Sequence, residues 1–173
     1  KEIVAMQPSY GKSIGILQRL QAADLVEDAI RLNGAAMTRH KVEIVKEFAP
    51  VPPITTDKHK VLQILVNLLR NAKYACDDSG RENKQINLKI TNGDDFVRIS
   101  VIDNGIGINP MFVPKLFERF AQADEGRSWR RGGLGLGLSI VKQFVEAHGG
   151  SVGANSPGEG LGAMFTITLP LPV

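Results

Sequence analysis

The sequence has little cysteine and no residue spacing typical of a structural metal site. Its 173 residues include a single cysteine, Cys76, so an internal disulfide cannot form. The three histidines, His40, His59 and His148, are not spaced as zinc ligands with one another or with Cys76. Disulfide-stabilised and zinc-stabilised folds are therefore excluded. A lone cysteine also agrees with a reducing compartment, so a cytoplasmic location is expected for this domain.

Long apolar runs and strong net charge are also missing. No stretch of about 18 apolar residues and no signal-peptide pattern occurs, so we expect no membrane-spanning segment. The net charge of +3 is too small to indicate nucleic-acid binding. The basic stretch 127–131 contains one aromatic residue, Trp129, whereas surfaces that stack on bases interleave several. Nucleic acid is therefore not an expected partner.

The length and the 43% hydrophobic content suit one domain with one core. Residues 1–19 have a loosely helical apolar pattern that is interrupted by Pro8, and they look like the end of a longer chain segment. We expect residues 1–19 to be the tail of a preceding helix with a connector, and residues 20–173 to form the domain.

Hydrophobic periodicity predicts alternating helices and strands along the domain. The first helix is expected to have Asp24 as its N-cap and to stop at Asn33-Gly34. The other expected helices cover residues 57–76, a short piece at 110–120, and 136–148. The expected strands cover residues 41–48, 85–91, 96–103, 151–154 and 163–169, of which 85–91 and 96–103 form a hairpin.

Two asparagines interrupt the apolar stripe of the predicted helix 57–76. Asn67 and Asn71 are four residues apart, so they lie on one face, one turn from each other. An amide that is buried without partners costs about 1–3 kcal/mol, so the pair suggests a polar ligand. The alternative is that both amides cap neighbouring backbone groups, and the pair alone does not decide between the two.

The predicted strand 96–103 ends in an aspartate that is followed by two spaced glycines. A fixed carboxylate at Asp103, beside backbone freed by Gly105 and Gly107, can accept a hydrogen bond from an exocyclic amine of a flat base. An Asx turn that closes the strand is the simpler explanation of this stretch by itself.

A glycine-rich run at 132–137 leads directly into the predicted helix 136–148. Such a run lets backbone amides approach an anion at a helix N-terminus, although it lacks the Lys of a Walker loop and the preceding strand of a dinucleotide fingerprint. A flexible loop before an amphipathic helix is the alternative. The polar segment 121–131, with Gly126 at its middle, is long for a connector and suggests a lid or a disordered loop.

Four stretches together resemble the conserved boxes of sensor histidine kinases: residues 67–72 (NLLRNA), 103–107 (DNGIG), 116–120 (LFERF) and 133–138 (GLGLGL). The resemblance covers almost the whole chain and points to the catalytic, ATP-binding domain. It implies the Bergerat fold of the GHKL group: an α/β two-layer sandwich with a mixed, mostly antiparallel sheet and helices on one face. It also implies ATP and Mg²⁺ as cofactors.

The resemblance assigns roles to individual residues. Asn71 would be the Mg²⁺ ligand, with Asn67 beside it near the phosphates, and Asp103 would accept the adenine amine. Asn67 and Arg119 are the candidates for a catalytic role. The remaining expected nucleotide-binding residues are Tyr74, Gly105, Gly107, Ile108, Phe120, Gly133, Leu134, Gly135, Leu136, Gly137 and Leu138, with Phe117 and Phe120 also anchoring the lid.

Several positions depart from the family pattern. Tyr74 stands where a Lys is common, three residues after Asn71, and Gln122 stands where a basic lid residue is common. Leu134 and Ala163 replace frequent hydroxyl residues. The missing positive charge would come from the lid, through Arg119 or the arginines at 127, 130 and 131, unless these only form a solvated face.

The resemblance further implies what acts with this domain. None of the three histidines has the setting of a phosphoacceptor, so the γ-phosphoryl group would pass to a histidine on a separate helical dimerisation domain. A response regulator would follow in a two-component phosphorelay, and the parent is expected to be a homodimer whose membrane association is left open. The alternatives are a degenerate nucleotide-binding or heterodimerising module, or a GHKL ATPase, which the amide of Asn67 in place of a basic Glu disfavours.

Overall fold

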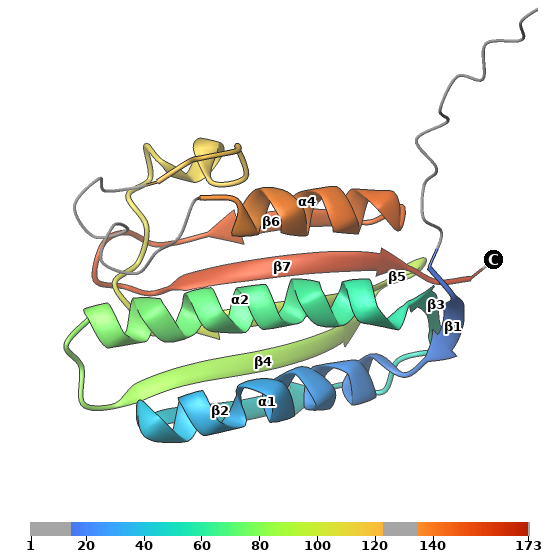
Figure 1. The fold of residues 1–173 in the computed structure, drawn as a ribbon, viewed down its shortest axis with the longest axis horizontal. Coiled ribbons are helices and arrows are strands. Elements are labelled where there is room, and N and C mark those ends of the chain that lie inside the picture. The colour runs from blue at the N-terminus through green and yellow to red at the C-terminus, as the bar shows by residue number, and fades with distance from the viewer. Residues whose placement is uncertain (1–14, 123–134, 173) are drawn as a thin grey trace, which may run out of the picture.

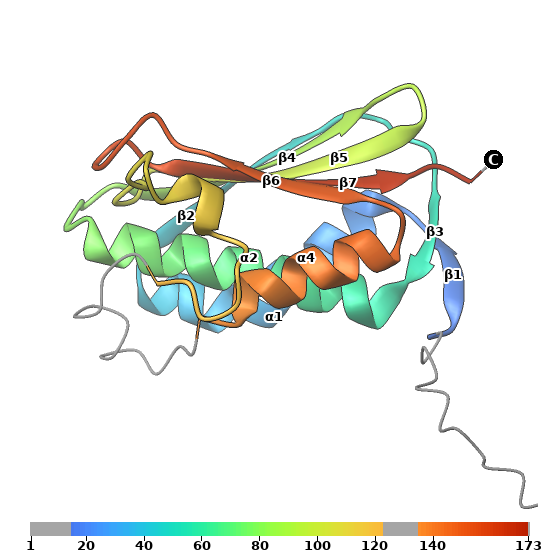
Figure 2. The same cartoon turned by 90° about the horizontal axis from the view of Figure 1, so that it is seen from above.

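The computed structural model describes residues 15–122 and 135–172, which form a sheet covered on one face by helices. Figure 1 looks onto the helical layer, and Figure 2 shows the sheet and the helices as two separate layers. The described helices are α1 Ala22–Arg39, α2 Lys58–Asp78 and α4 Gly137–Ala147, with one 3₁₀ turn at Val113–Lys115. The strands are β1 Leu17–Leu20, β2 Val42–Phe48, β3 Ile54–Asp57, β4 Lys84–Asn92, β5 Phe96–Asp103, β6 Ser151–Asn155 and β7 Ala163–Pro170.

The main sheet has the strand order β2-β4-β5-β7-β6. The pair β2 and β4 is parallel and all the other pairs are antiparallel, which confirms the expected mixed, mostly antiparallel sheet. The predicted hairpin is confirmed as β4 and β5. The parallel pair arises because the chain crosses through α2 between β2 and β4, as parallel strands require.

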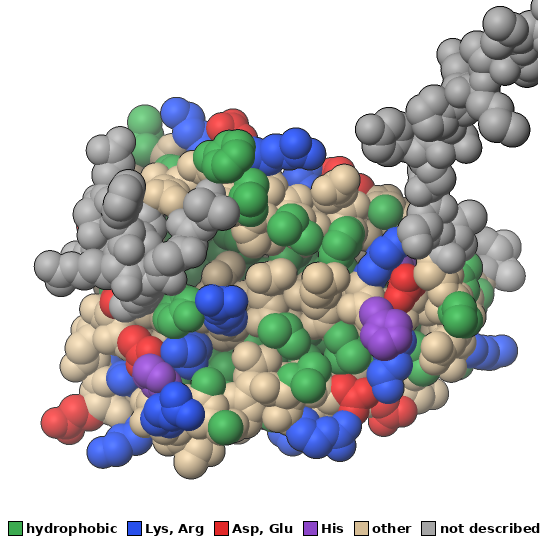
Figure 3. Space-filling view, viewed as in Figure 1, with side chains coloured by type: hydrophobic (Ala, Val, Ile, Leu, Met, Phe, Trp, Pro, Cys, Tyr) green, Lys and Arg blue, Asp and Glu red, His purple; other side chains and the backbone are tan. Residues whose placement is uncertain are grey.

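The core lies between the sheet and the helices. Strands β4, β5 and β7 alternate buried and more exposed residues, and their inward side chains meet the apolar face of α2. Side chains such as Leu68, Ile86 and Ile99 are fully buried, and each contributes about 1.5–3 kcal/mol through loss of contact with water. Charged side chains of both signs gather over α1, at the lower edge of the helical face in Figure 3.

Helix α1 is longer than the sequence predicts. It begins at Ala22, so Asp24 lies in the first turn and is not the N-cap, and it continues through Gly34 to Arg39. Glycine inside a helix costs about 1 kcal/mol relative to alanine. Burial of Met37 beyond the glycine offsets that cost, so the predicted stop at Asn33-Gly34 is wrong.

Helix α2 begins where the sequence predicts. Asp57 is its N-cap and accepts hydrogen bonds from the backbone N–H groups of His59 (3.0 Å) and Lys60 (3.3 Å). The residues before it, Ile54–Asp57, form β3 and pair with β1, a two-stranded sheet that the sequence pattern did not predict. Strand β1 lies partly in the segment that the sequence assigns to the connector.

The helix-like piece expected at residues 110–120 contains one 3₁₀ turn, Val113–Lys115. Pro114 lies at the start of this turn, where the missing N–H does not matter. None of the helices that the structure describes is both long enough and apolar enough to span a membrane.

Candidate functional site

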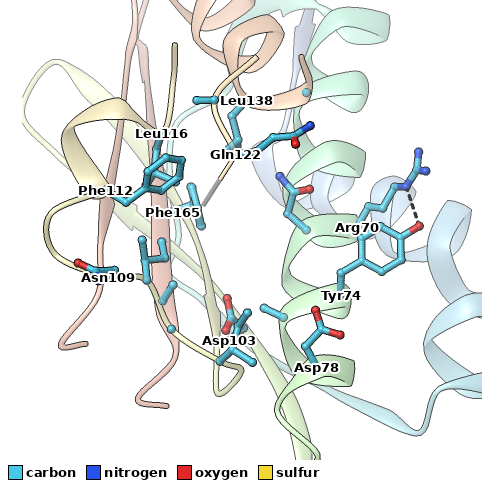
Figure 4. A pocket seen from close by; sticks show the side chains of 18 of the residues that line it. Arg70, Tyr74, Asp78, Asp103, Asn109, Phe112, Leu116, Gln122, Leu138 and Phe165 are labelled. Atoms are coloured by element: carbon cyan, nitrogen blue, oxygen red, sulfur yellow. Dashed lines mark hydrogen bonds between the residues drawn. The ribbon is translucent and has the colours of Figure 1, made fainter. Parts of the chain in front are cut away.

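A pocket of about 1030 Å³ lies between α2, the loop after β5 and the first residues of α4. Figure 4 shows side chains from these elements converging on it, with Leu138 toward one end and Asp78 and Asp103 toward the other. The described residues at its walls that the sequence singles out are Asn67, Asn71, Tyr74, Asp103, Gly107, Ile108, Gln122, Gly135, Leu136, Gly137, Leu138 and Ala163. Residues that are far apart in the sequence are therefore brought to one cavity.

Asn67 and Asn71 lie on the side of α2 that faces the pocket, and both are partly buried. Neither side-chain amide has a hydrogen-bond partner within the described part of the chain, so the alternative that they cap backbone groups is not observed. A partly buried amide without a partner is unfavourable, and here two of them point at an open cavity. The pair therefore presents amide oxygens and N–H groups to whatever fills the pocket.

The N-terminus of α4 lies beside Asn67. A β-carbon placed on Gly137, the first residue of α4, would be 3.4 Å from Oδ1 of Asn67. The N-cap residue Leu136 supplies no side-chain cap, so the first N–H groups of this helix are open to a ligand. Free N–H groups and the positive end of the helix dipole favour an anion at this end of the pocket.

Gly135 packs closely against the chain that precedes the segment 123–134. Its φ is +69°, and its carbonyl accepts a hydrogen bond from the N–H of Phe120 (3.0 Å). A β-carbon at this position would come within 2.9 Å of the Phe120 backbone, so only glycine fits here. Gly133 and Leu134, together with the lid arginines at 127, 130 and 131, lie outside the described residues.

The opposite end of the pocket is built around Asp103, which is 5% exposed. Oδ1 of Asp103 accepts a hydrogen bond from the N–H of Gly105 (2.8 Å), so the Asx-type bond exists and the carboxylate also lines the pocket. Burial raises the pKa of Asp103 to about 6, against the opposing effect of hydrogen bonds from the backbone of Gly105 and Ala163. Because the Asp103 carboxylate has few contacts with water, it favours an additional hydrogen bond from a ligand in the pocket.

The two ends of the pocket differ in charge. The acidic residues among its described walls are Asp78, Asp103 and Glu159. Glu159 adjoins Gly160, whose N–H bonds to the carbonyl of Ile106, so it lies toward the Asp103 end. The end at Asn67 and Gly137 has the helix N-terminus and no acidic side chain among the described residues. The pocket thus suits a ligand with a neutral, amine-bearing end and an anionic end.

Gly105 and Phe120, both expected at the ligand, do not line the pocket in the described structure. A β-carbon at Gly105 would collide with the backbone of Ala75, so this glycine lets the loop after β5 pack on α2. Phe120 is 68% exposed with φ +62°, whereas Phe117 packs edge-to-face on Phe165 with ring centroids 6.4 Å apart. Arg119 is exposed and is also absent from the pocket walls.

Tyr74 lines the pocket between two cations. Nε of Arg70 donates a hydrogen bond to the Tyr74 hydroxyl (3.2 Å), and Nζ of Lys73 lies 4.3 Å from the Tyr74 ring centroid. Lys73 is buried and forms an ion pair with Asp77 (3.4 Å). Its charge is therefore balanced inside the protein, and Lys73 does not line the pocket. Arg70 itself lines the pocket and is exposed.

The sequence did not single out several residues of the pocket walls. Phe165 projects inward from β7, and Ala75 carries the α2 carbonyl that accepts the N–H of Ile106 (3.1 Å). The others are Arg70, Asp78, Ser79, Arg81, Ile106, Asn109, Phe112, Leu116, Ala121, Glu159 and Gly160. Strand alternation identifies Phe165 as inward-facing, but no local pattern links the loop residues to the same cavity.

The described residues contain no cluster of three or more His, Cys, Asp or Glu side chains that could hold a metal ion. A divalent cation in this pocket would therefore take most of its ligands from a bound molecule and from water. Amide oxygens such as those of Asn67 and Asn71 suit a hard cation bound in that way.

Comparison with known proteins identifies relatives of this chain. Residues 56–173 match the family model described as "Histidine kinase-, DNA gyrase B-, and HSP90-like ATPase". The sensor histidine kinase WalK of Bacillus subtilis is 39% identical over 117 residues, which cover 68% of this chain and 19% of WalK. The hybrid signal transduction histidine kinase D of Dictyostelium discoideum is 36% identical over 140 residues, which cover 68% of this chain and 9% of that protein. The chain thus spans less than a fifth of the length of these two relatives.

Solved structures with the same fold include ShkA and the catalytic domain of a histidine kinase. Full-length ShkA in complex with AMPPNP aligns with a TM-score of 0.76 at 29% identity, covering 90% of this chain and 31% of ShkA. The catalytic domain of histidine kinase ThkA aligns with a TM-score of 0.76 at 24% identity, covering 90% of this chain and 95% of that domain. The second likeness confirms the α/β two-layer sandwich that the sequence predicts.

Proposed function

Because this chain belongs to the family of histidine kinase-, DNA gyrase B- and HSP90-like ATPases, we propose that it is the ATP·Mg²⁺-binding catalytic domain of a sensor histidine kinase. The observation that carries this proposal is the pair of unpartnered amides, Asn67 and Asn71, beside the N-terminus of α4 and across the pocket from the buried carboxylate of Asp103. The sequence similarity to the sensor histidine kinase WalK, and to ShkA, which was solved in complex with AMPPNP, supports the proposal.

The charge of the pocket sets the direction of the nucleotide. The adenine lies at the acidic end, where Asp103 accepts the exocyclic amine and Ile108 contributes to an apolar floor. The triphosphate lies at the other end, beside Asn67 and the open N–H groups of Gly137 and Leu138. The reverse orientation would place phosphates against three carboxylates, which electrostatic repulsion opposes.

The residues present fit a magnesium ion bound together with the nucleotide. Asn71 would supply an oxygen ligand, and phosphate oxygens and water would complete the shell, as Mg²⁺ prefers. When bound, the ion neutralises the charge that develops on the transferred phosphoryl group. Without a carboxylate cluster, the described residues have little affinity for the ion alone.

In the proposed reaction, the γ-phosphoryl group passes to a histidine on a separate helical dimerisation domain and then, through the whole kinase, to a response regulator. The chain's own residues contribute positioning and charge complementarity, which carry most of the catalysis of phosphoryl transfer. Asn67 orients the phosphates, and its amide cannot act as a base toward water. Transfer to a protein side chain is therefore favoured over hydrolysis.

Calorimetric titration with ATP and with GTP, each with and without Mg²⁺, tests the proposal. ATP is expected to bind more tightly with the ion present, and GTP is expected to bind weakly because its exocyclic pattern does not suit Asp103. Asp103→Asn should remove this preference. An assay of phosphotransfer to the helical domain of the parent kinase then distinguishes the two alternatives: transfer indicates an active kinase domain, and binding without transfer indicates a binding module. Absence of ATP binding would refute the proposal.

A further inference from the structure

We propose that Arg81 is a specificity-determining residue, which closes the base end of the pocket and limits the size of group that the exocyclic amine of the base can carry. This inference rests on the proposed function, because it takes Asp103 as the acceptor for that amine. It extends the function by adding a residue and a loop that have no role in the sequence-based prediction.

Arg81 joins two segments that are remote in the sequence. Nη2 of Arg81, just after α2, donates a hydrogen bond of 2.8 Å to the carbonyl of Gly160, in the loop between β6 and β7. Both residues line the pocket. The backbone of Arg81 is itself fixed, since its N–H donates to Oγ of Ser79 (3.2 Å) and that hydroxyl donates to the carbonyl of Cys76 (2.6 Å).

The bond from Arg81 completes a ring of hydrogen bonds around this end of the pocket. The N–H of Ile106 donates to the carbonyl of Ala75 on α2 (3.1 Å), and the N–H of Gly160 donates to the carbonyl of Ile106 (2.5 Å). Arg81 then connects Gly160 back to the end of α2. Because Asp103 lines the same pocket as Ile106, Gly160 and Arg81, we expect an amine that binds Asp103 to face this ring.

Most of the ring is rigid backbone. The N–H of Gly162 donates to the carbonyl of Gly105 (3.1 Å), and a β-carbon at Gly162 would collide with the carbonyl of Asp103. A β-carbon at Gly107 would likewise collide with the carbonyl of Gly158. The two glycine-containing loops are thus in backbone contact, and backbone hydrogen bonds join them. The Arg81 side chain, which is exposed, is the part of the ring that can be removed without disturbing the core.

An unsubstituted amine fits within this ring, whereas a large group on the amine would have to displace Arg81 and break its bond to Gly160. Discrimination of this kind arises from a steric and polar penalty against the wrong ligand, in addition to contacts with the right one. Arg81 is therefore expected to matter less for adenosine triphosphate than for analogues with a bulky N6 substituent.

Competition binding of ATP and N6-benzyl-ATP, each with Mg²⁺, tests the proposal. Arg81→Met keeps the apolar stem and removes the donors, Arg81→Lys restores one donor, and Arg39→Met is the matched control because Arg39 is exposed on α1 and absent from the pocket walls. We expect the wild-type protein to prefer ATP by about tenfold or more. Arg81→Met should reduce this preference by about fivefold or more, chiefly through tighter binding of the analogue.

Arg81→Lys should give an intermediate preference and Arg39→Met the wild-type preference. An unchanged ratio in Arg81→Met, or equal binding of both nucleotides by the wild-type protein, would overturn the inference while leaving the nucleotide site itself intact. If the wild-type protein binds neither nucleotide, the proposed function fails as well. Thermal unfolding of each variant verifies that the fold is retained.

Discussion

Gly137 lies beside Asn67 at the pocket: a β-carbon on the glycine would lie 3.4 Å from the side-chain oxygen of the asparagine. The first residue of α4 thus lies close to the middle of α2, although the two residues are 70 positions apart in the sequence. Because a side chain at position 137 would project toward Asn67, the glycine keeps open the end of the pocket that suits an anion.

Gly137→Val is expected to weaken ATP binding by about tenfold or more, because the branched side chain fills the space beside Asn67 that the phosphates need. Binding of adenosine, which occupies only the acidic end, should change little. Calorimetry with both ligands measures the contrast, and Gly153→Ala, at a position with no neighbour within 4 Å, is the control. Equal losses for ATP and adenosine would contradict the assignment of the two ends.

Asn71→Leu is expected to stabilise the empty protein while removing the effect of Mg²⁺ on ATP affinity. Leucine is the better helix former by about 0.5 kcal/mol, and it leaves no unpartnered amide, so the free energy of unfolding should rise by about 0.5–1 kcal/mol. Urea unfolding and ATP titrations with and without Mg²⁺ give the two readouts. Gln63→Leu, on the exposed side of α2, controls for the addition of an apolar side chain to this helix, since Gln and Leu have similar helix propensities. If Asn71→Leu keeps the gain in affinity from Mg²⁺, the metal role is wrong.

Asp103 is expected to make the stability of the empty protein depend on pH. Its pKa is raised to about 6 in the fold, mainly by burial, from an ordinary value of 3.8. The folded state therefore takes up the proton first as the pH falls, and the cost of the buried charge, about 1–3 kcal/mol at pH 7, disappears between pH 7 and 4. Asp103→Asn carries no such charge at any pH.

The stability of the wild-type protein minus that of Asp103→Asn should accordingly rise by about 1–3 kcal/mol between pH 7 and pH 4. Urea unfolding at the two pH values measures this difference. Asp94→Asn, in the exposed turn between β4 and β5, controls for loss of a surface carboxylate. A difference that is the same at both pH values would show that Asp103 is not held in a desolvating site.

Asp77 links the ends of three elements. Its carboxylate lies 2.8 Å from Nδ1 of His40 after α1, 2.9 Å from Nζ of Lys84 on β4, and 3.4 Å from Nζ of Lys73 on α2. Burial alone would raise the pKa of Asp77, but the hydrogen bond from Lys84 and the charges of His40, Lys73 and Lys84 lower it. The group therefore stabilises the fold above its ordinary pKa, and this contribution is lost as the pH falls through the lowered value.

Asp77→Asn is expected to destabilise the fold by about 1–3 kcal/mol at pH 7, because it leaves the buried Lys73 without its charge partner. The loss should shrink at strongly acidic pH, where the wild-type carboxylate is also protonated. Urea unfolding at neutral and acidic pH measures it. Asp95→Asn, at an exposed position, is the matched control. A loss that does not vary with pH would indicate a steric cause.

The fold was predictable where the signal is local. The alternating patterns of β4, β5 and β7, the N-cap Asp57 and the apolar stripe of α2 each follow from nearby residues, and the structure contains each of them. The predicted first helix ends too early because Gly34, considered by itself, is a plausible helix end. Only the burial of Met37 against the rest of the molecule carries the helix past it.

The candidate site was predictable in its parts. Asn67 and Asn71 stand out in the sequence because they interrupt the apolar stripe of a helix, and Asp103 stands out because it ends a strand before two spaced glycines. The structure places all three at one pocket. Gly105 was assigned to the ligand for its freedom from side-chain bulk, but that freedom serves the contact with Ala75. A sequence shows that a position is occupied by glycine, but it does not show which neighbouring residue leaves no room for a side chain there.

The sequence by itself determined most of the helices and strands and the chemical types at the site, because helix caps, periodicity and residue chemistry act over a few neighbouring positions. It did not determine the β1–β3 pair or the end of α1. The tertiary structure decided which remote groups meet: the parallel pairing of β2 with β4, the proximity of Gly137 to Asn67, and the bond from Arg81 to Gly160 across 79 residues. Such contacts depend on how whole elements pack, since burial of the shared core fixes the position of each loop, and no local pattern encodes that position.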